Sequence, residues 1–512
     1  MPTLYRNARL DARLDARLDD GRTTSAAAFV VDGPTLTWLG RDADAAPGAG
    51  TRSVDLGGAY VTPAFVDAHV HATATGLGLT GLDLRATSSL AEALAAIERA
   101  ARAARGRPIL GGGWDESRWP ERRPPTAAEL DRAAYGGAVY LARVDVHSAV
   151  VSSSVMASVP GLAGLAGYDP NGWQHEPQAH DAVRVAALEA LTTGQRRAAQ
   201  RAFLAEMAAL GVASVHEMGG PIISSPDDLA ELLELARAEP LPEVIGYWGE
   251  LHGIATAREL GAVGAAGDLF VDGSLGSHTA ALTVPYRDRP DTTGVLRFDT
   301  AELTQHVRAC ADAGLQAGFH AIGDAAVDQL LDAVEAIGPG AGAGHRIEHA
   351  EYVRDPARLA ASGLAASMQP VFDALWGGTD GLYAERLGRD RALALNRMGE
   401  LAAAGVPLAF GSDTPVTEAG PWAAVRAAAY PHDPGAGVSP RVAFAAHTAG
   451  GWSAARRDGG RLVAGAPATF TVWGTGQLGA DGLPDLRPGR ELPECLATVR
   501  DGTAIFDPHS LV

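Results

Sequence analysis

The chain has 512 residues, enough for two or three average domains or for one large barrel with an accessory domain. Its 42 basic and 61 acidic side chains give a formal net charge of −19, which argues against nucleic acid as a partner because phosphate backbones bind basic surfaces. The sequence has no apolar run long enough to cross a membrane, and its first residues alternate leucine with Asp and Arg, unlike a signal peptide. We therefore expect a cytoplasmic protein that does not contact membranes.

Both ends of the chain are typical of short β-strands separated by Gly, Pro and Asp. The expected strands are Leu4 to Leu10, Ala27 to Val31, Thr35 to Trp38, Ser53 to Leu56, Ala468 to Trp473 and Leu496 to Arg500, the last followed by an Asp-Gly hairpin turn. Neither end alone has enough strands to enclose a core. We therefore expect residues 1–60 and 459–512 to form one composite β-sandwich. The tandem Leu-Asp-Ala-Arg repeat within Leu10 to Asp20 is interpreted as a surface turn or a short helical insert.

The segment between these ends, residues 61–458, alternates apolar runs with helical stretches rich in Ala, Leu, Arg and Glu. This is the pattern of βα units around a parallel sheet. The candidate strands are Val61 to Ala68, Val212 to His216, Glu243 to Trp248, Asp268 to Val271, Gln316 to His320, Arg346 to His349, Ala365 to Met368 and Pro407 to Gly411. These strands predict an α/β fold, a (β/α)8 TIM barrel, although one wrong strand would leave an open sheet.

A long interval interrupts this pattern. Residues from about 87 to 193 are too many for one βα loop, so we expect an inserted subdomain near the barrel mouth.

The motif His69-Val70-His71 ends the first apolar run of the barrel segment. Residues i and i+2 of a strand point to the same side, so both imidazoles would face one way at a strand end. That arrangement suits Zn²⁺, Fe²⁺ or another borderline metal, and the C-terminal strand ends of a barrel carry its active site. A pair of histidines on a surface loop is the alternative reading of this motif alone.

Three further strand ends finish in a side chain that can bind a metal, namely His320, His349 and Asp413. Each alone could be a buried structural histidine or, for the aspartate, a helix N-cap. Together with His69 and His71 they would converge on one barrel axis, which favours a metal site. The chain has only two cysteines, Cys310 and Cys495, so histidine and carboxylate must supply the ligands.

Several motifs resemble those of the amidohydrolase superfamily, in particular its amidohydrolase-3 branch of YtcJ-like proteins and N-substituted formamide deformylases. They are Thr62 to His71, Gly113-Trp114-Asp115, Asp272 to Ser277, Pro285-Tyr286, His320 to Asp324, Arg346 to His349, Met368-Gln369-Pro370 and Gly411 to Val416. The resemblance covers nearly the whole chain. It implies metal-dependent hydrolysis in a (β/α)8 barrel with a composite β-sandwich.

The resemblance also implies roles for the strand-end residues. His69 and His71 would bind the first metal, His320 and His349 would bind metal or orient the substrate, and Asp413 would bind metal and act as general base. The chemistry is consistent, because a Lewis-acid metal lowers the pKa of a bound water to about 7 and a neighbouring carboxylate can accept its proton. We expect Zn²⁺ or another divalent transition metal, at one or two ions per chain.

The sequence departs from this resemblance at Asp268. Many relatives have at this position a lysine that is carbamylated and bridges two metals, and the chain has no lysine nearby. Either one metal suffices, or another acid bridges, which could be Asp268 or Glu217. For His216, burial or a hydrogen bond behind the metal site is as good an interpretation as metal ligation.

Other residues are weaker candidates for substrate binding. Trp114 and His147 lie in the insert, where buried aromatic core is the simpler explanation for a tryptophan. Asp272 and His278 belong to a glycine-rich segment that we interpret as an active-site loop.

We expect an enzyme that hydrolyses an amide or formamide C–N bond in a small molecule, of the class that acts on carbon–nitrogen bonds other than peptide bonds. A deaminase, a hydrolase of cyclic amides, esters or carbamates, and a binding protein that has lost catalysis are the alternatives. The expected partner is a small-molecule substrate, and a homo-oligomer is compatible with the sequence.

Overall fold

The computed structural model of the chain describes residues 1–10, 27–46, 48, 50–144, 148–175 and 178–512. The chain divides into two compact units. The barrel unit consists of Met1–His71, Leu204–Gly220 and Leu233–Val512, and the insert unit consists of Ala72–Phe203 and Pro221–Leu232. Within the described ranges no helix has both the length and the apolar character needed to span a membrane. The tandem Leu-Asp-Ala-Arg repeat lies outside the described residues.

The barrel unit contains a sheet of eight parallel strands in the order β18-β17-β16-β15-β14-β13-β12-β6. Their bounds are β6 Phe65–Val70, β12 Val212–Gly219, β13 Glu243–Trp248, β14 Gly264–Ala265, β15 Gln316–Ala321, β16 Arg346–His349, β17 Ala365–Met368 and β18 Leu408–Phe410. A parallel bridge between Val70 and Thr414 joins the two edges, so the barrel is nearly closed. The expected α/β barrel is confirmed.

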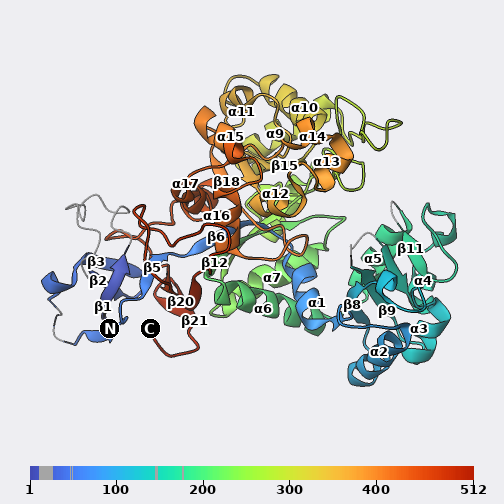
Figure 1. Cartoon of the computed structure of the whole chain (residues 1–512), viewed down its shortest axis with the longest axis horizontal. Helices are drawn as coiled ribbons and strands as arrows, with labels where there is room; N and C mark the ends of the chain where they lie inside the picture. The colour runs from blue at the N-terminus through green and yellow to red at the C-terminus, as the bar shows by residue number, and fades with distance from the viewer. Residues whose placement is uncertain (11–26, 47, 49, 145–147, 176–177) are drawn as a thin grey trace. The chain divides into compact units, whose positions relative to one another are not determined.

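Helices surround these strands (Figure 1), which are buried on both faces as is typical of a parallel sheet. The helices that lie wholly in the barrel unit are α8 Ile254–Leu260, α9 Thr300–Ala313, α10 Asp324–Glu335, α11 Pro356–Ser362, α12 Pro370–Trp376, α13 Leu382–Leu387, α14 Arg389–Ala392, α15 Met398–Ala404, α16 Pro421–Ala429, α17 Pro440–Ala446 and α18 Ala449–Ala454. Local sequence sets their limits. In α9, Asp299 caps the first turn in a reciprocal box with Glu302, and Gly314 ends the helix at φ 72°.

Two expected barrel strands differ from the structure. The run Val61 to Ala68 divides at Ala64, because β5 (Tyr60–Pro63) pairs with a C-terminal strand and only β6 enters the barrel. The fourth barrel strand is Gly264–Ala265 and ends before the expected strand Asp268 to Val271 begins. Pairing with β13 and β15 selects the short Gly-Ala segment. The chain beyond it meets β15 at an isolated bridge from Phe270 to His320 and forms no further strand there.

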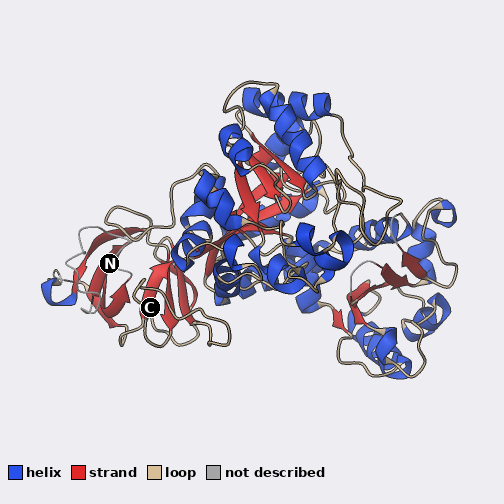
Figure 2. Ribbon diagram, turned by 45° about the horizontal axis from the view of Figure 1, so that its top comes forward, coloured by secondary structure: helices blue, strands red, loops and turns tan. Residues whose placement is uncertain are grey.

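Both termini contribute to a second sheet, in the order β21-β20-β19-β5-β1-β2-β3 with β4 paired to β1 (Figure 2). The strands are β1 Thr3–Leu10, β2 Ala27–Asp32, β3 Thr35–Arg41, β4 Arg52–Asp55, β19 Phe470–Gly474, β20 Glu494–Arg500 and β21 Thr503–Phe506. Tyr5, Phe29 and Phe470 pack with ring centroids 4.9 to 5.5 Å apart in its core. The β-structure built from both ends is therefore confirmed, while the boundaries at residues 60 and 459 stay predictions.

The insert unit contains a sheet in the order β11-β10-β9-β8-β7. Its strands are β7 Leu82–Asp83, β8 Ile109–Trp114, β9 Val139–Arg143, β10 Ser148–Val151 and β11 Trp173–His175, with helices α1 Ala72–Thr80, α2 Leu90–Ala104, α3 Ala127–Ala133, α4 Ser153–Ser158 and α5 Ala179–Glu189. Two further helices, α6 Thr193–Ala209 and α7 Pro226–Ala238, each contribute residues to both units. An inserted sheet is confirmed, whereas the limits 87 and 193 and a place near the barrel mouth stay predictions.

Candidate metal centre

The two histidines of the His-x-His motif lie at the end of β6 and face two carboxylates. His69 Nε2 lies 3.5 Å from Asp268 Oδ2 and 3.5 Å from Asp413 Oδ1. His71 Nε2 lies 3.2 Å and 3.1 Å from the same two oxygens. The strand alternation that we expected therefore places both imidazoles on one side.

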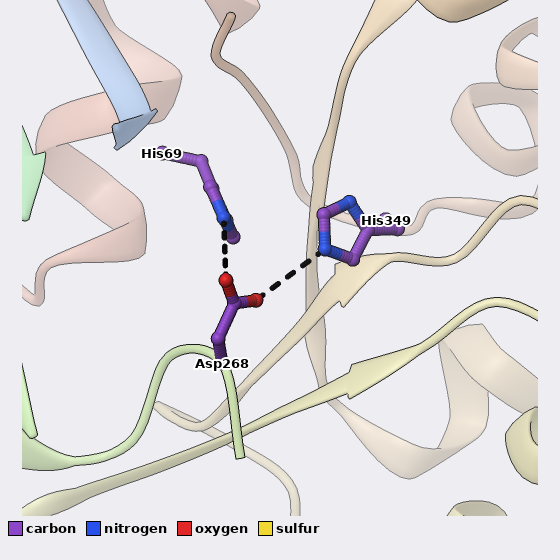
Figure 3. Close-up of side chains that lie close together, drawn as sticks. All are labelled: His69, Asp268 and His349. Carbon is purple, nitrogen blue, oxygen red and sulfur yellow. Dashed lines mark ion pairs between the residues drawn. The ribbon is translucent and has the colours of Figure 1, made fainter. Parts of the chain in front are cut away.

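The other oxygen of Asp268 faces the two remaining histidines. Its Oδ1 lies 3.5 Å from His320 Nδ1 and 3.5 Å from His349 Nε2. Figure 3 shows this carboxylate between His69 and His349. The structure thus brings together His69, His71, His320, His349 and Asp413. Asp268, one of the two expected bridging candidates, lies at their centre.

Asp413 follows β18 in a backbone conformation with φ 57°, which is uncommon for a residue other than glycine. Its N–H donates to the His69 carbonyl (2.8 Å), and this bond fixes Asp413 beside β6. The next helix, α16, begins only at Pro421 and has Gly420 at its N-cap position. Asp413 is therefore not the N-cap of that helix.

Hydrogen bonds behind the site orient three of the imidazoles. His69 Nδ1 donates to Glu348 Oε2 (3.0 Å), His349 Nδ1 donates to Gln369 Oε1 (2.8 Å), and His320 Nε2 donates to the Gly273 carbonyl (3.2 Å). Each bond holds a proton on one ring nitrogen, so that in the neutral imidazole the other nitrogen presents the lone pair. These remaining nitrogens are the ones that face Asp268.

Glu348 itself is held by a buried arginine. Arg346 Nε donates to Glu348 Oε1 (2.5 Å) and its Nη2 donates to Oε2 (2.9 Å), and both side chains are fully buried. Burial alone would raise the pKa of Glu348, but the charge of Arg346 and the bond from His69 lower it to about 2. Glu348 therefore remains a carboxylate and keeps a proton on His69 Nδ1.

The site contains buried polar atoms that a cation would satisfy. Among the described residues, the buried atoms His69 Nε2, Asp268 Oδ1, His320 Nδ1 and His349 Nε2 have no hydrogen-bond partner. Each such group costs about 1–3 kcal/mol if it stays unsatisfied. Two residue groups have metal-ligand spacing, one of His69, Asp268 and His349 and the other of His69, His71 and Asp413. Nitrogen and oxygen donors of this kind fit a divalent transition metal.

The pKa values of His69 and His71 also indicate that the carboxylates of Asp268 and Asp413 require positive charge nearby. Burial lowers the pKa of His71, but hydrogen bonds to Asp268 and Asp413 outweigh it and raise the pKa to about 10. The pKa of His69 is also raised, against burial, by the charges of Asp268 and Asp413. Without a metal, the carboxylates thus retain protons on these imidazoles, and a bound cation would take the place of those protons.

Other predicted residues have different contacts. Arg346 Nη1 donates to His216 Nδ1 (2.9 Å), so His216 supports the arginine, and neither His216 nor the buried Glu217 belongs to the two ligand groups. Asp272 accepts backbone N–H groups from Ala281, Ile322 and Gly323 at 2.8 to 3.0 Å, which anchors the loop after β14.

Three weak candidates for substrate binding are also placed by their contacts. His278 Nε2 lies 2.9 Å from Asp288 Oδ2, within the same loop. Trp114 is buried in the core of the insert unit and donates to the Leu141 carbonyl (2.8 Å), in agreement with the simpler interpretation. His147 lies outside the described residues.

Sequence reasoning missed the roles of Arg346, Glu348 and Gln369. A signal was present, because Arg346 and Glu348 are charged residues at positions i and i+2 of a strand that is otherwise apolar and ends in a ligand candidate. Charged side chains are seldom fully buried unless they are paired. The partner of Gln369 depends on the neighbouring strand and could not be read from the sequence.

Comparisons with known proteins agree with this geometry. The profile of the Amidohydrolase family (Amidohydro_3) matches residues 52–506. The chain is 30% identical over 421 residues to Protein LONG AFTER FAR-RED 3 of Arabidopsis thaliana, covering 74% of this chain and 70% of that protein. It is 28% identical over 408 residues to the putative amidohydrolase YtcJ of Bacillus subtilis, covering 74% of each.

A solved structure is similar over almost the full length. An uncharacterized metal-dependent hydrolase from Pyrococcus furiosus aligns with a TM-score of 0.78 and 30% identity, over 92% of this chain and 98% of the other. The chain thus resembles a metal-dependent hydrolase in both sequence and fold. Its own structure contains a cluster of histidine and aspartate side chains with metal-ligand spacing.

Proposed function

The chain belongs to the amidohydrolase family and is a metal-dependent hydrolase, and from this premise we propose that it cleaves the C–N bond of an amide or formamide in a small organic molecule. The convergence at the barrel strand ends of four buried ligand atoms that have no hydrogen-bond partner among the described residues carries this proposal. The amide class is supported by the similarity to a putative amidohydrolase along most of the chain. We propose Zn²⁺ or another divalent transition metal, because the ligands are imidazoles and carboxylates.

His69, His71, His320, His349, Asp268 and Asp413 would hold the metal. A bound divalent ion polarises a carbonyl group and lowers the pKa of a coordinated water. Glu348 and Gln369 keep the imidazoles of His69 and His349 in the tautomer that turns a lone pair toward the site. This preorganisation limits the loss of rotational freedom when the site is filled.

Asp413 is the proposed general base. It is a buried carboxylate whose pKa, against the effect of burial, is lowered by the charge of His69 and by a hydrogen bond from His71. Asp413 is therefore ionised at neutral pH and can accept a proton from the attacking water as the C–O bond forms. It then delivers that proton to the nitrogen as the C–N bond breaks, so the products are a carboxylic acid and an amine.

The proposed partner is a small-molecule substrate. A nucleic acid is excluded from the proposal because the chain carries a formal charge of −19. We also propose that the chain forms a homo-oligomer. Size-exclusion chromatography with light scattering tests this.

A panel of N-acyl and N-formyl amines, cyclic amides, carbamates and esters tests the proposal with Zn²⁺-loaded protein. We expect hydrolysis of an open-chain amide or formamide and its loss on chelation. Hydrolysis restricted to esters or cyclic compounds, deamination alone, or no turnover by metal-loaded protein would contradict the amide assignment.

On the substrate that the panel identifies, Asp413→Asn tests the general base. This variant should keep most of its metal but lose about 10²–10⁴-fold in kcat, because an amide can coordinate weakly yet cannot accept the proton. Asp373→Asn is a matched control, since Asp373 lies on α12 and pairs with the exposed His432. Near-wild-type turnover of Asp413→Asn would remove Asp413 from the mechanism.

A further inference from the structure

An arginine lies one aromatic ring away from a candidate metal ligand. The guanidinium carbon of Arg297 lies 5.3 Å from the centroid of the Phe270 ring, close enough for a cation–π contact. The Phe270 centroid lies 4.6 Å from that of His320, whose Nδ1 faces Asp268. The half-buried Phe270 ring therefore contacts both the candidate metal centre and a positive charge.

Backbone contacts hold this arginine at the C-terminal end of the barrel strands. Phe270 forms an isolated parallel bridge with His320, one residue before β15 ends. The Arg297 N–H donates to the Val271 carbonyl (2.8 Å), and Asp299, two residues later, caps the first turn of α9. Arg297 is thus placed at the end of the barrel that carries the histidines and aspartates of the site.

The positive charge of Arg297 has no partner within the described ranges. Its side chain is exposed and forms neither an ion pair nor a hydrogen bond with a described residue. Other arginines at the loop between β14 and α9 are paired, Arg289 with Asp291 (3.0 Å) and Arg386 with Asp288 (2.5 Å). A cation–π contact consumes no N–H donor, so the donors of Arg297 remain available.

Arg297 can therefore recognise an anion close to the reacting bond. A guanidinium presents paired N–H groups that match two oxygens of a carboxylate or a phosphate. A carbonyl at His320 and an anionic group at Arg297 would be separated by the Phe270 ring, so one small molecule can reach both. A neutral amide would leave the guanidinium without a partner.

We propose that Arg297, supported on Phe270, binds an anionic oxygen group of the amide substrate, either a carboxylate or a phosphate. This inference rests on the proposed function and deepens it, because it names the class of amide that the site selects. The metal centre acts on the amide bond, and Arg297 holds the charged end of the same molecule.

Arginine modification tests the binding site without any turnover. Phenylglyoxal reacts with exposed guanidinium groups, and mass spectrometry follows its addition to Arg297 and to Arg52, an exposed reference residue on β4. The probes are N-acetylglycine and N-acetylethanolamine phosphate, each compared with its neutral counterpart, N-acetylglycinamide or N-acetylethanolamine. We expect only the anionic probes to slow modification of Arg297 in metal-loaded protein, and neither residue to respond to the neutral ones. Equal protection by anionic and neutral probes, or no protection by either, would overturn the inference.

Turnover of matched substrate pairs tests the selectivity. Arg297→Met keeps an apolar contact with Phe270 but removes the N–H donors, so kcat/KM for anionic amides should fall about 10–100-fold, mainly through KM. The value for neutral amides should not change. Arg297→Lys should restore part of the preference, because an ammonium keeps the charge but not the paired donors. Arg289→Met is the matched control in the same loop and should change neither value.

The outcomes separate this inference from the proposed function. An equal loss for anionic and neutral amides in Arg297→Met would show a structural role and overturn the inference. Wild-type protein that hydrolyses neutral amides as well as their anionic partners would also refute it, while the proposed function would stand. Selective protection of Arg297 without hydrolysis of any amide would support the anion site and contradict the proposed function.

Discussion

Replacing Glu348 with glutamine tests how the barrel supports its metal ligands. In the structure, Glu348 accepts two hydrogen bonds from the fully buried Arg346 and one from His69 Nδ1. Glu348→Gln leaves the Arg346 charge buried without its carboxylate. Removing one partner of a buried ion pair costs about 3–5 kcal/mol, so we expect a loss of that size in the free energy of unfolding of metal-free protein.

The same replacement should weaken metal binding. Glutamine can present its NH₂ group to His69, which would favour the wrong tautomer and direct a proton toward the site. Loss of such a supporting hydrogen bond lowers metal affinity about 10–100-fold. Denaturant unfolding and a competition titration with a chromophoric chelator measure the two effects.

Glu335→Gln is the matched control for this experiment. Glu335 also pairs with an arginine, Arg358, but its side chain is 49% exposed, so the expected loss is at most about 1 kcal/mol. Metal affinity should not change in the control. If Glu348→Gln matches the control in both stability and affinity, the reasoning about the buried Arg346–Glu348–His69 chain is wrong.

Two further predictions concern the parts of the chain outside the metal centre. Deleting residues 459–512 removes β19, which pairs with β5, and should expose the N-terminal residues to proteolysis; independent, cooperative folding of residues 1–60 would contradict this. Glu129→Gln tests a pH effect in the insert unit, because hydrogen bonds from Arg123 and from Thr126 lower the pKa of Glu129 from 4.5 to about 2. A lowered folded-state pKa stabilises the unit above pH 4.5, and this gain is lost as the pH falls toward 2. Thermal unfolding of the variant should therefore occur at a lower temperature than that of wild type at pH 6 and at the same temperature near pH 2, and an equal difference at both pH values would contradict the assignment.

The clustering of the candidate ligands could be predicted because it depends on local patterns. An apolar run followed by a histidine or aspartate locates a strand and its end, and the closure of parallel strands brings those ends together. His69, His71, His320, His349 and Asp413 were identified in this way.

The choice between Asp268 and Glu217 could not be made from the sequence, because it depends on tertiary structure. The run Leu269-Phe270-Val271 has higher β-propensity than Gly264-Ala265, yet the latter pairs with its neighbours. The sequence left both Asp268 and Glu217 as bridging candidates, and the structure brings Asp268 to 3.2–3.5 Å from the four histidines. The division of Val61 to Ala68 at Ala64 is similar, because one continuous apolar run serves two sheets.

The metal content of the double variant His69→Ala/His71→Ala tests the central claim most directly. After equilibration with Zn²⁺ and removal of loosely bound ions, wild-type protein should retain at least one tightly bound ion per chain. The double variant should lose the tight ion of the site formed with Asp413, and it should lose hydrolysis as well. His432→Ala, which removes an exposed histidine paired with Asp373, should keep the wild-type content. Full metal content in the double variant would contradict the assignment of this cluster as the metal centre.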